Sequence, residues 1–134
     1  MQAPLNSVKS LIDDVRTLLL DQRQPYRYTD IELLSALNTA LLEGRRVRAD
    51  LYVTRFGNQV PYYNAVTGDA FCIEPQFRLA FVFGTAAQAL LRDDEDVQDE
   101  RANDFMARFH DILIGIAAKP VSGGTPNAPK KAQG

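Results

Sequence analysis

The chain has 134 residues, 46% of them hydrophobic, which is ordinary for one globular domain whose core forms without metal or disulfide bonds. Its formal net charge of −2 and its pI near 5.3 argue against a dedicated DNA-binding protein, because such proteins are usually basic. Cys72 is the only cysteine, which excludes an intrachain disulfide, and residues 1–8 hold no apolar run typical of a signal peptide. The longest apolar run, residues 79–91, is too short to span a bilayer, so we expect no membrane partner.

A first helix is predicted over residues 6–21, because hydrophobic side chains recur there at helical spacing on one face. We assign Lys9, Asp13, Asp14 and Arg16 to the opposite, polar face. Pro25 lies in the connection that follows and prevents the helix from continuing. The hydrophobic face consists of Val8, Leu11, Ile12, Val15, Leu18 and Leu19.

The start of the second helix is the most strongly determined feature of the sequence. Thr29 and Glu32 have the spacing of a capping box, in which each side chain bonds the backbone N–H of the other residue. Tyr28 and Leu33 occupy the two positions of a hydrophobic staple around that box. We expect the helix to reach residue 48, although Gly44 weakens its last turn. Its apolar positions are Ile31, Leu34, Leu37, Leu41, Leu42 and Val47.

A β-rich insertion is predicted over residues 51–73. Residues 51–56 are interpreted as a strand, and residues 59–63 as a second extended piece that Pro61 restricts to an edge. Turn residues at 57–58 and 66–69 separate these pieces from a third short strand at 70–73. This insertion would lie between the second and third helices.

A third helix is predicted from residues 74–75 to residue 92, with Pro75 at its first position. It is apolar nearly all round, so helices of the same subunit or a neighbouring subunit must cover it, and small residues such as Gly84 permit close packing. A fourth helix is predicted from residue 94 or 96 to residue 118, with acidic residues in its first turn, where the helix dipole favours them. Its apolar stripe consists of Phe105, Phe109, Ile112, Leu113 and Ile116.

The predicted fold is therefore mainly α: a small helical bundle of about four helices with a short β-rich insertion and an extended C-terminal tail. Residues 1–118 form the predicted helical domain. Residues 119–134 have no core-forming pattern and are predicted to be a flexible or extended tail.

No pattern in the sequence predicts a catalytic, cofactor-binding or metal-binding site. His110 is the only histidine and has no Cys or His neighbours at ligand spacing, so we interpret it as a boundary or surface residue. Cys72 is interpreted as a small buried hydrophobic residue, because no base lies near it in the sequence. Residues 93–96 lack the spacing of a calcium loop. They are interpreted as helix-capping acids or as an acidic patch that lines a channel or repels DNA.

Two groups of residues are candidates for protein contacts. The basic residues at the end of the second helix suit a helix C-terminus or a salt-bridged subunit interface, and suit nucleic acid less well in an acidic chain. The aromatic residues of the insertion suit either a small sheet resting on the helices or an exposed partner surface. The two groups are Arg45, Arg46 and Arg48, and Tyr52, Phe56, Tyr62, Tyr63 and Phe71.

The order of these elements is distinctive. A short amphipathic helix precedes Tyr-Thr-Asp-Ile-Glu-Leu-Leu-x-x-Leu-Asn at residues 28–38. An insertion, a helix that begins near Pro75 and an alanine-rich stretch at residues 86–94 lead to a last helix with Arg101, Ala102 and Phe109. Over residues 6–116 the chain resembles the head-to-tail connector proteins of tailed bacteriophages, which are also called adaptor or gateway proteins.

The resemblance implies a structural virion protein without enzymatic activity or cofactor. Members of the family are small helical bundles that form a ring, typically a dodecamer, beneath the portal protein. The ring extends the DNA channel, through which DNA passes without specific binding, and offers a docking surface to a tail or nozzle protein. The protein would be made in the host bacterial cytoplasm and reside in the neck of the virion.

The resemblance also implies contacts for particular residues. The C-terminal segment of the chain would reach the portal, which makes Lys119, Lys130 and Lys131 candidate portal contacts. The insertion would contact a neighbouring subunit or the tail. The candidates there and at the end of the second helix are Arg45, Arg46, Arg48, Tyr52, Phe56, Tyr62 and Tyr63.

The main alternative is a small helical DNA-binding or regulatory protein, in which the second and third helices form a recognition unit. A long insertion between them argues against a helix-turn-helix, whose turn has only about three or four residues. A small enzyme is a more distant alternative.

Overall fold

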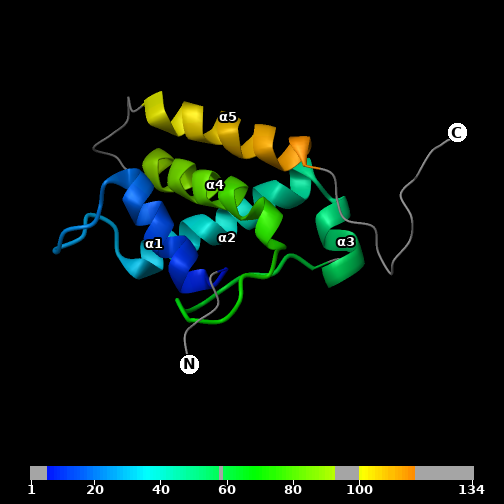
Figure 1. Ribbon diagram of the computed structural model, residues 1–134, viewed down its shortest axis with the longest axis horizontal. Coiled ribbons are helices and arrows are strands. Elements are labelled where there is room, and N and C mark those ends of the chain that lie inside the picture. Colours follow the sequence, from blue (N-terminus) through cyan, green and yellow to red (C-terminus); the bar gives the residue numbers. More distant parts are fainter. Residues whose placement is uncertain (1–5, 58, 93–99, 117–134) are drawn as a thin grey trace, which may run out of the picture.

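The computed structural model describes residues 6–57, 59–92 and 100–116, and this part of the chain is mainly helical. Figure 1 shows α4 in the middle of the molecule, with α5 above it, α1 in front and α2 behind. The elements are α1 (Val8–Leu19), α2 (Asp30–Val47), α3 (Asp50–Phe56), the 3-10 turn η1 (Pro75–Phe77), α4 (Arg78–Leu91) and α5 (Glu100–Gly115).

The central helix α4 is covered within the subunit, because α1, α2 and α5 all pack against it. Its side chains from Ala80 to Val82 and from Gly84 to Ala87 are buried, and only Leu79 and Leu91 are largely exposed among its hydrophobic residues. The sequence left open whether the same subunit or a neighbour covers this helix, and the three packed helices answer that question. Pro75 starts the 3-10 turn that leads into the helix, as its fixed φ favours.

Helix α1 begins and ends with local hydrogen bonds. Ser7 and Ser10 form a capping box at its start, and the predicted hydrophobic face is buried apart from the half-buried Leu18. At its end Leu20 has φ 61°, and the N–H groups of Leu20 and Asp21 donate to the carbonyls of Thr17 and Arg16. This is the Schellman arrangement, in which glycine is the usual left-handed residue.

The predicted start of α2 is confirmed. The Thr29 hydroxyl accepts from the Glu32 N–H at 3.0 Å, and the Glu32 carboxylate accepts from the Thr29 N–H at 2.7 Å. Tyr28 and Leu33 are both buried, as the hydrophobic staple requires. Ile31 and Leu42 were expected on the apolar side of this helix, but they are 77% and 60% exposed.

The predicted β-rich insertion is wrong, because residues 50–56 form helix α3 and the described residues contain no strand. Asp50 lies in the first turn of α3 and pairs with Arg48, while the N–H groups of Tyr52 and Val53 both donate to the carbonyl of Ala49. The rings of Tyr52 and Phe56, four positions apart, lie 6.0 Å from each other on one side of the helix. Burial of these rings against the bundle overrides the local preference for a strand.

Residues 59–73 follow an irregular path that the rest of the subunit fixes at several points. One isolated bridge pairs Ser7 with Ala70, and the first N–H groups of α1, from Val8 and Lys9, donate to the carbonyls of Asp69 and Thr67. These carbonyls satisfy donors that a helix start leaves unpaired. The predicted strand at 70–73 is thus reduced to a single bridge at Ala70.

Helices α4 and α5 approach closely at Gly84. A Cβ atom on this residue would lie 2.9 Å from Cδ1 of Phe109, whose ring is fully buried. This confirms the prediction that a small residue here permits close packing. The described part of the fourth predicted helix is α5, while its predicted start at residue 94 or 96 and the predicted tail at 119–134 lie outside the described residues.

Candidate interaction surfaces

Arg48 joins the α2–α3 junction to the end of α5. Its guanidinium donates to the carbonyls of Leu113 at 2.6 Å and Ile116 at 2.8 Å, two groups that the end of a helix leaves unpaired. It also forms a bidentate pair with Asp50, at 2.9 and 2.7 Å, and this hydrogen bond lowers the pKa of the Asp50 carboxyl. The Arg48 side chain is only 15% exposed, so the structure places this candidate interface residue inside the subunit.

The other two candidate arginines lie in the last turn of α2. Arg46 is exposed and pairs with Glu43, whose carboxylate also bonds His110 Nε2 on α5 at 2.9 Å. The hydrogen bond from Arg46, followed by that from His110, lowers the pKa of Glu43. The His110 side chain is 32% exposed, which agrees with its interpretation as a boundary residue, and its bond to Glu43 joins α5 to α2. Arg45 is half-buried, and its buried Nε has no hydrogen-bond partner within the described part of the chain.

Tyr52 is a core residue and cannot contact a partner as the subunit stands. Its side chain is fully buried, and its hydroxyl would lie 2.6 Å from a Cβ atom on Gly44. Burial raises the pKa of the Tyr52 phenol above its ordinary value. The glycine that weakens the last turn of α2 is thus the residue that lets α3 pack there. Phe56 is half-buried at the edge of the same core.

Tyr62 is presented to solvent by a segment that Asn38 holds in place. The Asn38 amide donates to the Tyr63 carbonyl at 2.7 Å, and its oxygen accepts from the Tyr63 N–H at 2.8 Å. The Tyr63 hydroxyl accepts from the N–H of Cys72 at 2.8 Å, and its ring lies 6.2 Å from that of Phe71. Tyr63 is therefore turned inward, whereas Tyr62 is 72% exposed.

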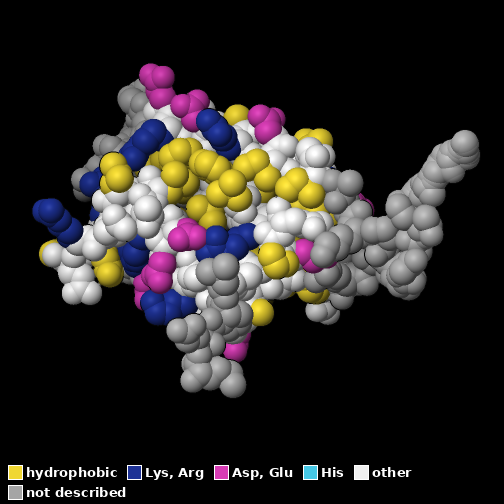
Figure 2. Space-filling view, viewed as in Figure 1, with side chains coloured by type: hydrophobic (Ala, Val, Ile, Leu, Met, Phe, Trp, Pro, Cys, Tyr) yellow, Lys and Arg dark blue, Asp and Glu magenta, His cyan; other side chains and the backbone are white. Residues whose placement is uncertain are grey.

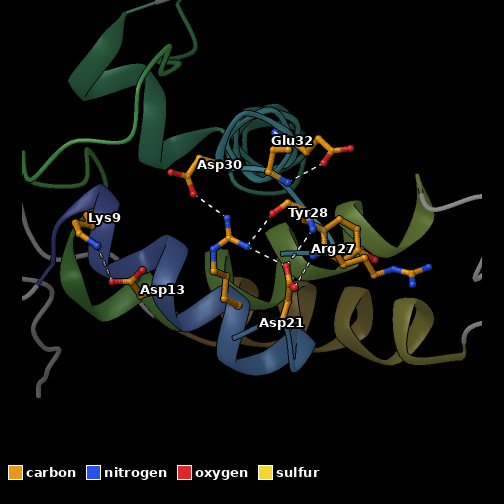
Figure 3. Close-up of polar contacts among 9 residues, drawn as sticks. Lys9, Asp13, Asp21, Arg27, Tyr28, Asp30 and Glu32 are labelled. Carbon is orange, nitrogen blue, oxygen red and sulfur yellow. Dashed lines mark hydrogen bonds and ion pairs between the residues drawn. The ribbon is translucent and has the colours of Figure 1, made fainter. Parts of the chain in front are cut away.

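A buried ion-pair network fixes residues 20–28, which we call the α1–α2 loop (Figure 3). Arg16 is 5% exposed and donates to Asp21 Oδ2 at 2.9 Å, to the Tyr28 carbonyl at 2.8 Å and to Asp30 Oδ1 at 2.7 Å. The Asp21 carboxylate accepts from the N–H groups of Arg27 at 2.7 Å and Tyr28 at 3.1 Å. Each buried charge has partners, as burial of ions requires. The assignment of Arg16 to the polar face was therefore wrong.

The outer part of this loop is exposed. Leu20 is 81% exposed and Tyr26 is 40% exposed, and the Arg16 guanidinium lies 3.9 Å from the centre of the Tyr26 ring. Arg23 and Arg27 are also exposed, and residues 22–27 contain no acidic side chain. The bond between Gln24 and Pro25 is cis. The network below thus supports a loop that offers apolar, aromatic and basic groups to solvent.

Hydrophobic side chains also gather on the surface over α4 and α5 (Figure 2). Leu79 is 54% exposed, and the half-buried rings of Phe83 and Phe105 lie 5.6 Å apart. The Arg108 guanidinium lies 5.8 Å from the centre of the Phe83 ring. A contiguous apolar surface of this kind is typical of a protein contact site.

The described residues contain no group of three or more metal-ligating side chains, and none of the helices described is both long and apolar enough to cross a membrane. Cys72 is half-buried and not disulfide-bonded. The candidate portal contacts Lys119, Lys130 and Lys131 lie outside the described residues.

The sequence reasoning missed Asn38 as a clamp and Arg16 as a buried residue. Arg16 stands four positions after Ile12 and three before Leu19, which are both on the buried face, and this spacing is a signal that could have placed it there. The partner of Asn38 lies 25 positions away in an irregular segment, so no local pattern indicates the clamp.

No protein-family model matches the chain, and neither the search of curated proteins nor the search of solved structures found a similar protein.

Proposed function

We propose that this protein is a structural subunit of the neck of a tailed bacteriophage, where copies form a ring between the portal and the tail. The observation that carries the proposal is the segment at residues 28–38, on which the resemblance to head-to-tail connector proteins chiefly rests. Each of its polar anchor residues has a structural task here. Thr29 and Glu32 cap the helix, and Asn38 clamps residues 59–73.

The surface of the subunit supports a role in assembly. Tyr62, which was a candidate contact, is exposed on the clamped segment, and tyrosine is enriched at protein interfaces. The apolar surface over α4 and α5 adds a second area suited to a partner. Such surfaces suit a subunit that contacts both its neighbours and a tail or nozzle protein.

The negative net charge of the chain suits the wall of a channel through which DNA slides. A net charge of −2 favours repulsion of phosphates over tight binding. In the proposed ring, which we expect to be a dodecamer, DNA passes through the channel without specific binding. The ring needs no enzymatic activity and no cofactor.

A helix-turn-helix regulator is the second candidate, because α2 and α3 are separated only by residues 48–49. The earlier argument concerned the predicted third helix, which is α4 and lies beyond α3, so it does not apply to the pair of α2 and α3. Its recognition helix would have to offer side chains to the DNA groove, whereas α3 has Asp50 and the half-exposed Val53 on its outer side, with Leu51 and Tyr52 buried. The adaptor proposal is therefore favoured.

The proposal is tested by mixing the purified chain with portal rings and sedimenting the complex. We expect the full chain to co-sediment with several copies per portal. A chain that lacks residues 119–134 should keep its helical circular dichroism and bind the portal more weakly. A full chain that ignores the portal but binds duplex DNA, with an affinity that falls steeply as salt rises, would support the regulator instead.

A further inference from the structure

Arg48 is the point at which four parts of the subunit meet. It follows the last residue of α2, and its guanidinium holds the carboxylate of Asp50, the first residue of α3, through Nε at 2.9 Å and Nη2 at 2.7 Å. Its Nη1 donates to the carbonyls of Leu113 and Ile116 at the end of α5, at 2.6 and 2.8 Å. The guanidinium also lies 5.7 Å from the centre of the buried Phe77 ring of η1. Every nitrogen of the guanidinium therefore has a partner on α3 or at the end of α5.

The end of α5 has few means of its own to stay closed. The last carbonyls of a helix lack intrahelical partners and form the negative end of its dipole, so a cation is favoured there. The last turn of α5 contains no basic side chain. Its final residue, Gly115, favours a helix poorly, and a Cβ atom there would meet no atom within 4 Å, so packing at that residue does not hold the helix end. Arg48 supplies from the α2–α3 junction the charge and the donors that α5 lacks.

The contact lies at the point where the C-terminal segment, residues 117–134, begins. Ile116 is the last described residue before this segment, and Figure 1 shows the end of α5 beside α3, at the end of the molecule opposite the α1–α2 loop. Lys119 follows Ile116 by three residues, and three residues span at most about 11 Å. The position of the end of α5 therefore sets where the first lysine of the segment can lie.

We propose that Arg48 is a positioning residue for the C-terminal segment. By holding the last carbonyls of α5 against α3, it fixes the point from which the segment leaves the helical bundle and approaches the portal. A segment that starts from a fixed point loses less conformational freedom on binding than one that starts from a frayed helix end. This inference rests on the proposed function, in which Lys119, Lys130 and Lys131 contact the portal.

Arg48→Lys is the informative substitution, because it keeps the positive charge near the end of α5. The planar guanidinium pairs with Asp50 through two nitrogens and reaches both carbonyls with the third. The single nitrogen of lysine cannot reproduce the bidentate pair and reach both carbonyls at the same time. Arg46→Lys is the matched control, because Arg46 is exposed two positions earlier and its described ion pair is with Glu43, which a lysine can keep.

The test measures two properties of the full chain. Amide hydrogen exchange over residues 112–116 reports whether the end of α5 stays closed, and titration with purified portal rings reports binding. Arg48→Lys should speed the exchange about tenfold and weaken portal binding about three- to tenfold. Asp50→Asn, which removes the charge that orients Arg48, should show smaller changes in the same directions. Arg46→Lys should match the wild type in both measurements.

A double-mutant comparison separates positioning from a general effect on stability. The full-length variant Lys119→Ala/Lys130→Ala/Lys131→Ala removes the candidate contacts of the segment. Adding Arg48→Lys to it should speed amide exchange as before but cause no further loss of portal binding. Thr29→Ala, which destabilises the distant start of α2, should bind the portal like the wild type. Circular dichroism checks that each variant is folded, and Asp50→Asn replaces Arg48→Lys in the comparison if the latter does not fold.

Wild-type exchange over residues 112–116 in folded Arg48→Lys would overturn the inference, because the contact would then not hold the end of α5. An equal loss of portal binding with and without the three lysines would also overturn it, because Arg48 would then act through the bundle. Arg48→Lys that binds the portal as tightly as the wild type overturns the inference and leaves the proposed function standing. If the wild type ignores the portal, the proposed function fails, while amide exchange still decides whether Arg48 holds the start of the segment.

Discussion

Replacement of Gly84 by alanine tests the closest helix contact in the core. The added Cβ would lie 2.9, 3.0 and 3.1 Å from Cδ1, Cγ and Cε1 of the Phe109 ring. That ring is fully buried and packs edge-on against Phe81 at 5.4 Å, so it cannot turn away into solvent. Either the ring or the α4–α5 spacing must shift by about half an ångström to restore ordinary contact.

Two effects of opposite sign set the magnitude. Alanine is favoured over glycine inside a helix by about 1 kcal/mol, while overpacking of a core costs about 1 to 3 kcal/mol. We therefore expect Gly84→Ala to lower the free energy of unfolding by about 1 kcal/mol, which lowers Tm by about 3 to 5 °C at this chain length. Gly115→Ala is the control, because a Cβ there meets no atom within 4 Å. It should leave stability unchanged or raise it by up to about 1 kcal/mol.

Urea unfolding followed by far-UV circular dichroism measures both substitutions under two-state conditions. A double-mutant cycle with Phe109→Leu isolates the contact, because the smaller side chain should relieve part of the Gly84→Ala penalty. A Gly84→Ala variant that gains as much stability as Gly115→Ala would refute the packing described for α4 and α5.

Other predictions concern the anchors of the fold. Thr29→Ala should lower the unfolding free energy by about 1 kcal/mol, with Thr29→Ser nearly neutral, and equal Tm values for Thr29→Ala and wild type would remove the capping box. Asn38→Ala leaves the N–H and carbonyl of Tyr63 unpaired and should cost about 1 to 3 kcal/mol. Amide exchange at Tyr63 should speed up, and unchanged exchange would contradict the clamp. The lowered pKa of Glu43 means that its stabilisation is present above its ordinary pKa of 4.5 and is lost as pH falls through the folded value. The free energy of unfolding of Glu43→Gln should therefore fall less in acid than that of the wild type. Equal losses for the two proteins as the pH is lowered would contradict this.

The sequence predicted those parts of the fold that depend on local or periodic signals. The capping box at Thr29 acts over three residues, and the Pro75 start and the α1 face follow directly from residue type and spacing. The error at residues 50–56 has a tertiary cause. Tyr52 becomes buried because Gly44 makes room for it on α2, and this favours a helix where a strand was expected.

The candidate surfaces were less predictable, because exposure depends on partners distant in sequence. Arg48 and Tyr52 are used inside the subunit, whereas Tyr62 is exposed. The α1–α2 loop was predicted only as a connection. It is supported by the buried pair of Arg16 and Asp21, and both residue types usually lie on the surface, so the sequence did not indicate this support.

The central claim is that this protein forms a ring on the portal, and the most direct measurement is electron microscopy of purified portal rings incubated with the full chain. The account predicts an additional ring on the portal axis, built from repeated copies of the chain and open along the DNA channel. Portal particles without added density, from a preparation in which the chain is folded and in excess, would contradict it.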